Sequence, residues 1–206
     1  MRKEAIIIGY SGHAFVVLDV LLANKYKVSG YCEQELKLKN PYELSYLGSE
    51  GDEKVIEQIK DLHAFIAIGD NYIRAKIFER LMAMNVSCPI LVHPHACLSS
   101  KAKLGLGTVV MPGVVVNSCT EIGNAVICNS SAVIEHECLI GDYSHIAPGA
   151  VLAGNVIVGR NTFVGANAVI RQGVKIGSEV IIGAGSVVIR DVPDGSTVYG
   201  NPSKKR

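Results

Sequence analysis

The sequence predicts a small α/β domain followed by a parallel β-helix, and three observations support this. Up to residue 88, short apolar strands alternate with helical stretches. From Val92 to Pro193, aliphatic residues recur at every sixth position, apart from a cysteine at one of them, and a small residue follows each four places later. The pattern changes between Pro89 and Pro94. We therefore expect one domain at residues 1–88 and a second at 89–206 that ends in a C-terminal tail.

The N-terminal elements follow from runs of apolar residues and from helical spacing. The expected strands are Ala5–Gly9, Val28–Cys32 and Ala64–Gly69. The expected helices are His13–Asn24, Glu53–Lys60 and Tyr72–Met84. Alternation of this kind is typical of a parallel sheet covered by helices, a small Rossmann-like unit.

A repeat of six residues suits a β-helix in which each hexad forms one flat side of a triangular coil. The first position of the hexad points inward, and the small fifth position fits where the interior narrows. Glycines that follow inward residues are expected to supply backbone freedom at the corners. Residues 18 apart then lie one above the other, about 4.8 Å apart.

Composition limits the function. The 206 residues carry a net charge of +1 with no basic stripe, so nucleic acid is not an expected partner. No apolar run is long enough to span a bilayer and no signal peptide is evident, so a cytoplasmic protein without a membrane partner is expected. The six cysteines are scattered, and their spacing predicts no metal site. Cys128 and Cys138 are expected in the core.

Two glycine-bearing loops follow strands at the same end of the predicted sheet, where ligands of open α/β sheets bind. The first contains Gly9, Ser11, Gly12 and His13, and opens a helix. It is not a full dinucleotide fingerprint, so an ordinary tight turn is an equal alternative. The second is Gly69-Asp70-Asn71-Tyr72-Ile73-Arg74. Arg74 is a candidate phosphate partner, or else a solvated helix charge.

The polar run Glu135-His136-Glu137 interrupts the repeat, and His145 follows nine residues after His136. His136 is the candidate base that removes a proton from an acceptor nucleophile, and Glu137 is placed to orient its ring. The alternative for His136 is an exposed histidine on an idle edge. A metal shared with His145 is less favoured, because no third ligand is evident.

Hexad arithmetic places Gly154 one coil beyond His136, where its N–H is a candidate oxyanion donor. Ala166 and Ala184 form another column, and two small residues stacked in line would leave a groove. His136 and His145 differ by half a coil. We therefore expect a site between neighbouring subunits, with His136 from one chain and His145 from the next.

Units such as Ile122-Gly123-Asn124-Ala125-Val126 and Ile182-Gly183-Ala184-Gly185-Ser186-Val187 resemble the hexapeptide repeats of acyltransferases with left-handed β-helices. With the two N-terminal loops, the chain resembles the sialic acid O-acetyltransferase and UDP-4-amino-sugar N-acetyltransferase family. The resemblance implies a left-handed coil and a homotrimer. It also implies a nucleotide-sugar site at Gly9, Ser11, Gly12, His13, Gly69, Asn71 and Arg74.

The same resemblance implies roles in the β-helix: His136 as base, Glu137 beside it, and His145 in contact with acetyl-CoA. The groove along Ala166 and Ala184 is then expected to hold the pantetheine arm. Arg190 and Lys204 are possible partners for CoA phosphates, although a plain surface charge is the commoner interpretation. Relatives carry a pair of acidic residues after the second strand. This chain has Cys32-Glu33, so Glu33 is expected to serve alone.

The predicted function is N-acetylation of a nucleotide-linked amino sugar of the UDP-4-amino-sugar type, with acetyl-CoA as cosubstrate and no metal. The nearest alternative is O-acetylation of sialic acid or another sugar by the same residues. A noncatalytic scaffold or a carbonic anhydrase on the same fold is less favoured, because the anhydrase needs a set of zinc histidines that is not found here.

Overall fold

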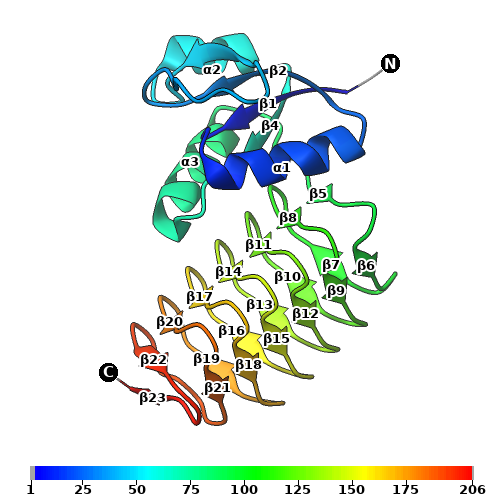
Figure 1. Cartoon of the computed structure of the whole chain (residues 1–206), viewed down its shortest axis with the longest axis vertical. Coiled ribbons are helices and arrows are strands. Elements are labelled where there is room, and N and C mark those ends of the chain that lie inside the picture. The colour runs from blue at the N-terminus through cyan, green and yellow to red at the C-terminus, as the bar shows by residue number, and fades with distance from the viewer. Residues whose placement is uncertain (1–2, 206) are drawn as a thin grey trace.

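A computed structural model describes residues 3–205. The N-terminal domain is a four-stranded parallel sheet in the order β3-β2-β1-β4 (Figure 1). Its strands are β1 Glu4–Ile8, β2 Lys27–Cys32, β3 Ser45–Gly48 and β4 His63–Ile66. Strands β2 and β3 are added on one side of β1, and β4 is added on the other side. The order of the strands therefore reverses between β1 and β4. Their carboxyl ends form the crevice where ligands of such sheets bind.

Three helices pack with this sheet: α1 Gly12–Ala23, α2 Glu53–Ile59 and α3 Asn71–Ala83. Asp52 and Asp70 are the N-cap residues of α2 and α3, and each side chain accepts a hydrogen bond from a backbone N–H in the first turn. All three helices lie within a residue or so of their predicted bounds.

Strand β3 was not predicted from the sequence. Its residues are exposed or half-buried and few, so they lack the apolar run that marks the other strands. Tyr46 nevertheless pairs with Tyr31 of β2, which extends the sheet at its edge. Short, half-buried edge strands give weak patterns, because little of their surface has to be apolar.

The second domain is a parallel β-helix with three flat faces (Figure 1). Face 1 consists of β5 Leu91–Val92, β8 Val109–Val110, β11 Ile127–Cys128, β14 His145–Ile146, β17 Phe163–Val164, β20 Ile181–Ile182, β22 Thr197–Tyr199 and the antiparallel β23 Lys204–Lys205. Face 2 consists of β6 Cys97–Leu98, β9 Val115–Val116, β12 Val133–Ile134, β15 Val151–Leu152, β18 Val169–Ile170 and β21 Val187–Val188. Face 3 consists of β7 Lys103–Leu104, β10 Glu121–Ile122, β13 Leu139–Ile140, β16 Ile157–Val158 and β19 Lys175–Ile176. The predicted fold class, an α/β domain followed by a parallel β-helix, is confirmed.

The register follows the predicted stacking of residues 18 apart: Ile127 pairs with His145, and His145 with Phe163. The small fifth positions are buried from Thr108 onward, and where they are Thr or Ser the hydroxyl can join neighbouring coils. Thr108 Oγ1 donates to Gly123 O (2.8 Å) and accepts from Val126 N (3.1 Å). A small polar residue at this position therefore satisfies backbone groups inside the corner.

The glycines that follow inward residues have a different cause from the one predicted. A Cβ at Gly141 would lie 2.6 Å from the backbone nitrogen of Arg160, and one at Gly165 would lie 2.5 Å from Ile182 O. Neither residue has a positive φ, whereas Asn155 and Asn167, which do, are not glycines. These glycines permit close stacking of coils, and backbone freedom at the corners is not what requires them.

The domains meet along face 1. Ala64 N donates to Ser87 O within the α/β sheet, while Gly107 N donates to Cys88 O from the first coil. Asn24 Nδ2 on α1 reaches Val92 O at 2.9 Å. Face 1 is thus covered in its upper coils by the N-terminal domain, which positions the loops of that domain above β14.

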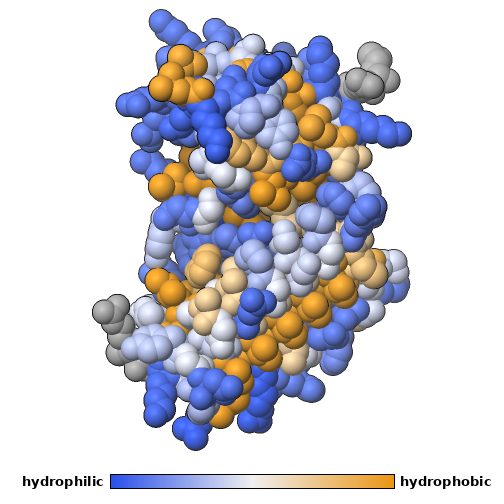
Figure 2. Space-filling view, viewed as in Figure 1, coloured by the Kyte–Doolittle hydropathy of each residue, from blue (hydrophilic) through white to orange (hydrophobic). Residues whose placement is uncertain are grey.

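Face 2 carries an apolar ladder on its outside. Figure 2 shows a diagonal band of hydrophobic residues over β9, β12, β15, β18 and β21. The outward residues of these strands are all valine and are half-buried or exposed, with Val169 at 41%. They are Val115, Val133, Val151, Val169 and Val187. None of the described helices is long and apolar enough to cross a bilayer.

Candidate active site

His136 lies at the edge between faces 2 and 3, in the turn from β12 to β13. Its Nδ1 is 3.0 Å from Glu137 Oε2, and the side chains are 51% and 65% exposed. When Nδ1 donates its hydrogen to the carboxylate, Nε2 is left as the proton acceptor. A histidine oriented in this way by a carboxylate has the arrangement of a general base.

Gly154 lies directly beneath the His136 ring. A Cβ at this position would be 2.5 Å from both Cε1 and Nε2 of the imidazole, so a side chain there would push the ring away. Among the described residues no acceptor is found for the Gly154 N–H. Two successive turns of this edge therefore carry a proton acceptor and, on the next coil, a glycine whose N–H has no acceptor among the described residues.

His145 is on the outer side of face 1 and is buried at 8% exposure. It packs edge to face on Phe163, with ring centroids 5.0 Å apart, and Nε2 is 3.0 Å from Asn129 Nδ2. Burial, followed by the charge of Arg74 and then that of His13, lowers the pKa of His145 to about 3, while the nearby Gly69 carbonyl acts in the opposite direction. Its Nδ1 makes no hydrogen bond of acceptable geometry with a described residue.

His13, in the first turn of α1, faces His145 with ring centroids 6.2 Å apart. Burial lowers its pKa to about 4, and the charge of Arg74 adds to that effect. Both histidines are therefore neutral at pH 7. The loop that follows β1 thus meets the β-helix at the predicted acetyl-CoA residue.

Arg74 of α3 is 1% exposed and spans the junction between the domains. Its hydrogen bonds run from Nε to Ala125 O (2.8 Å), from Nη1 to Ile68 O (2.9 Å) and Gly69 O (3.0 Å), and from Nη2 to Asn71 Oδ1 (2.7 Å), Tyr143 O (2.6 Å) and Ser144 O (3.3 Å). A guanidinium has five N–H donors, and all five have protein acceptors here. Arg74 was expected to contact a phosphate, but it has no free N–H left for one. The alternative expectation, that Arg74 is a solvated charge on the helix surface, is wrong.

The loops after β1 and β4 lie side by side, because these strands are neighbours in the sheet. Gly9 has φ +88, and a Cβ there would lie 2.7 Å from Ile68 Cγ1. Gly12 and Gly69 face open space. The structure thus brings Gly9, Ser11, Gly12, His13, Gly69 and Asn71 to one sheet end, as the topology predicts.

Glu33 is hydrogen-bonded to the loop that follows β1. Its Oε2 accepts from Tyr10 N at 3.1 Å, and Oε1 accepts from Gln34 N at 3.1 Å. Lys37 Nζ is 3.8 Å from Oε2. The carboxylate thus lies beside the glycine loop, at the end of β2.

Ala166 and Ala184 stack on consecutive coils at the edge between faces 1 and 2, and Gly185 N donates to Ala166 O at 2.8 Å. This edge adjoins the face of His145, whereas His136 lies at the opposite edge of face 2. One face is six residues wide, up to about 20 Å when extended. Within one chain, His136 is therefore separated from the alanine column.

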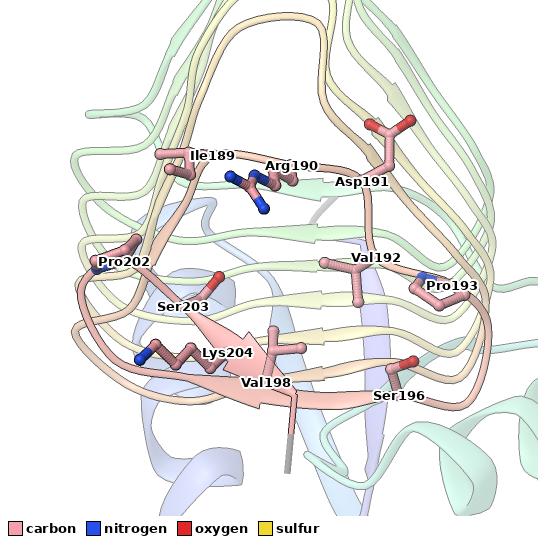
Figure 3. A pocket seen from close by; sticks show the side chains of 10 residues that line it. All are labelled: Ile189, Arg190, Asp191, Val192, Pro193, Ser196, Val198, Pro202, Ser203 and Lys204. Atoms are coloured by element: carbon pink, nitrogen blue, oxygen red, sulfur yellow. The ribbon is translucent and has the colours of Figure 1, made fainter.

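Arg190 and Lys204 line a different feature, a hollow of about 350 Å³ at the C-terminal end of the β-helix (Figure 3). Val192 and Val198 are among its apolar walls. Among residues 3–205, no cluster of three or more His, Cys, Asp or Glu side chains could hold a metal.

Sequence reasoning missed Asn129, which contacts His145. The residue comes directly after the inward Cys128, where the other coils carry varied residues, so its type gave no signal. The stacking rule could have placed it near His145, because the residues are 16 apart on adjoining coils.

Family models match both parts of the chain: the PglD N-terminal domain at residues 4–81, and the bacterial transferase hexapeptide (six repeats) at residues 155–190. The acetyltransferase domain of PglB from Neisseria gonorrhoeae FA1090, solved in complex with acetyl coenzyme A, is 33% identical. Each chain is covered fully, with a TM-score of 0.93. The chain belongs to the PglD-type hexapeptide-repeat N-acetyltransferases of nucleotide amino sugars.

Other family members agree with this assignment. PerB from Caulobacter crescentus, solved in complex with CoA and GDP-perosamine, is 34% identical, with a TM-score of 0.93 over 99% of this chain and 97% of that one. GDP-perosamine N-acetyltransferase of Escherichia coli O157:H7 and UDP-N-acetylbacillosamine N-acetyltransferase of Bacillus subtilis (strain 168) are each 33% identical, over 62% and 53% of this chain. The chain spans about half the length of these two curated relatives. The family expected from the sequence is confirmed.

Proposed function

We propose that this protein transfers the acetyl group of acetyl-CoA to the amino group of a nucleotide-linked 4-amino sugar. The observation that carries the proposal is the His136 corner, where a carboxylate-oriented imidazole lies on a glycine with a free N–H. Acyl transfer to an amine needs a proton acceptor and a donor for the oxyanion. That corner supplies both.

In the proposed reaction the sugar amine attacks the thioester carbonyl, and a C–N bond forms as the nitrogen loses a proton to His136 Nε2. Glu137 stabilises the imidazolium through Nδ1. Gly154 N–H donates to the oxyanion of the tetrahedral intermediate. When the C–S bond breaks, the proton passes from His136 to the departing CoA sulfur.

The acetyl-CoA is proposed to lie along the column of Ala166 and Ala184, with its acyl end at His145. That position is one face away from His136 of the same chain. A second copy that covers the valine ladder of face 2 would bring its own edge against His136. We therefore propose a homotrimer in which each site combines His136 of one protomer with His145 of another.

The nucleotide sugar is proposed to bind at the carboxyl ends of β1 and β4. Its phosphates would approach the N–H groups at Ser11, Gly12 and His13, where α1 begins. Glu33 is placed to accept from a ribose hydroxyl or base beside this loop. Acetyl-CoA and nucleotide sugars are cytoplasmic metabolites, so we propose that the protein acts there.

A thiol-release assay with acetyl-CoA tests the proposal against UDP-, GDP- and TDP-linked 4-amino sugars and free sialic acid. UDP-linked sugars are the expected substrates, and a preference for GDP would change the nucleotide but not the reaction. Release driven by sialic acid alone would replace N-acetylation by O-acetylation. No release with any acceptor would contradict the proposal.

A further inference from the structure

The junction between the two domains holds a buried cation that the proposed reaction does not use. Arg74 is completely enclosed, and four of its acceptors are backbone carbonyls within two segments: Ile68 and Gly69 of the α/β domain, and Tyr143 and Ser144 of the β-helix. Fixing so many carbonyls with one planar group demands a single relative placement of the two segments.

The segment of the β-helix held in this way leads directly into His145. Ser144 O accepts from Arg74 Nη2 and also from Ile127 N, and His145 N donates to Thr162 O at 2.9 Å. On the other side of the ring, Asn129 Nδ2 donates to Nε2, which leaves the hydrogen on Nδ1. The backbone and the ring of His145 are therefore both constrained.

Arg74 also shapes the other wall around this ring. Its Nη1 donates to the carbonyl of Gly69, which also acts on the pKa of His145. Asn71, which accepts from Arg74 Nη2, continues the network to Asn161 O at 3.0 Å. The charged and titratable groups around His145 are Arg74 from α3 and His13 from α1, with Asp70 beside Arg74.

We propose that Arg74 is a positioning residue, which docks the α/β domain on the β-helix and holds a neutral His145 in place for acetyl-CoA. This rests on the proposed function, because it gives His145 its acyl-end role. Burial lowers the pKa of Arg74 to about 10, so the guanidinium is still a cation at neutral pH. A buried cation next to an imidazole disfavours the imidazolium, and a neutral ring does not compete with His136 for the amine's proton.

The test uses the full chain with Arg74→Lys, Arg74→Met and the control Arg80→Met, whose side chain lies on the same helix and donates to Gly51 O of the α/β domain. We expect kcat/KM to fall about tenfold or more for both Arg74 variants and to stay unchanged for the control. In a His145→Ala background, Arg74→Lys should cost less than about threefold. Equal losses in both backgrounds would show a purely structural role and overturn the proposal.

NMR titration of the His145 ring gives a readout that does not depend on turnover. In the wild type the ring should stay neutral down to about pH 5, and Arg74→Met or the milder Asn71→Ala should raise its pKa. A wild-type His145 that titrates near 6.5 would contradict the proposal even if the Arg74 variants failed to fold. Lack of acetyl transfer by the wild type would contradict the proposed function. The titration would still show whether Arg74 keeps the His145 ring neutral.

Discussion

The corner around His136 and the junction around His145 place the same residue type in opposite environments. His136 is half-exposed, is paired with a carboxylate and lies over a glycine. His145 is buried between an arginine, an asparagine and an aromatic ring, and its pKa is lowered to about 3. The first is open to solvent beside a carboxylate, as the proposed base requires, and the second is held neutral. A histidine's role thus follows from what surrounds its ring, and the sequence repeat alone does not determine it.

Removing the imidazole at the corner should have the largest effect. His136→Ala is expected to lower kcat/KM for acetyl transfer about 10²- to 10⁴-fold, because a positioned general base contributes that much. Glu137→Gln should cost less, because the ring keeps its place over Gly154. The thiol-release assay measures both, and full turnover by His136→Ala would refute its role as base.

A charged residue in the valine ladder of face 2 should separate the subunits of the proposed trimer, and with them His136 from the His145 of the neighbouring protomer. Val151→Glu would bury a carboxylate in the proposed subunit contact, so we expect monomers and an activity loss of at least about 100-fold with unchanged circular dichroism. Light scattering gives the mass. The control Lys103→Glu on face 3 should remain trimeric. A monomeric wild type would refute the assembly.

Filling the space beneath the imidazole should displace the base without removing it. Gly154→Ala is expected to reduce kcat by about tenfold or more, because its Cβ would lie 2.5 Å from the His136 ring. Gln172→Ala, one coil further along the same column, should have no effect. Unchanged turnover by Gly154→Ala would show that the position of the His136 ring over residue 154 does not matter.

The buried junction predicts a pH dependence of stability. His13 and His145 have folded pKa values of about 4 and 3, below the unfolded value of 6.5. Protons bind the unfolded chain first, so this stability is complete above pH 6.5 and is lost as the pH falls towards 4 and 3. The free energy of unfolding should fall by about 1.4 kcal/mol per pH unit for each histidine.

Urea unfolding at pH 5 and 7.5, at fixed protein concentration, measures this slope. His145→Gln should reduce the slope, and the control Gln172→Ala, which removes no titratable group, should not change it. Equal stability of the wild type at both pH values would contradict the burial of these two histidines.

The β-helix was more predictable than the junction, for a physical reason. In a solenoid each coil repeats the last, so positions 18 apart must stack, and the columns of His136 with Gly154 and of Ala166 with Ala184 follow from counting. The reason for a glycine at a given position cannot be obtained by counting alone. Gly141 and Gly165 are required by coil spacing, which the repeat does not distinguish from corner strain.

The contacts between the two domains could not be predicted from the sequence. Arg74 appeared as a cation in a loop at the ligand-binding end of a sheet, the usual place for a phosphate partner. Its acceptors include carbonyls of Ala125 and Tyr143, 51 and 69 residues away, and backbone carbonyls look the same in every residue. Asn129 was missed for another reason: its residue type gave no signal, although the stacking of adjoining coils could have placed it near His145.

Subunit complementation tests the shared site most directly. Co-expression of His136→Ala and His145→Ala chains gives mixed trimers in which some contacts join an intact His136 to an intact His145 of the neighbouring chain. With random assembly, about a quarter of the sites should be intact, and about a quarter of wild-type activity should return. If both histidines act within one chain, no mixture will exceed the activity of the two parent variants, and the proposal of a shared site will be wrong.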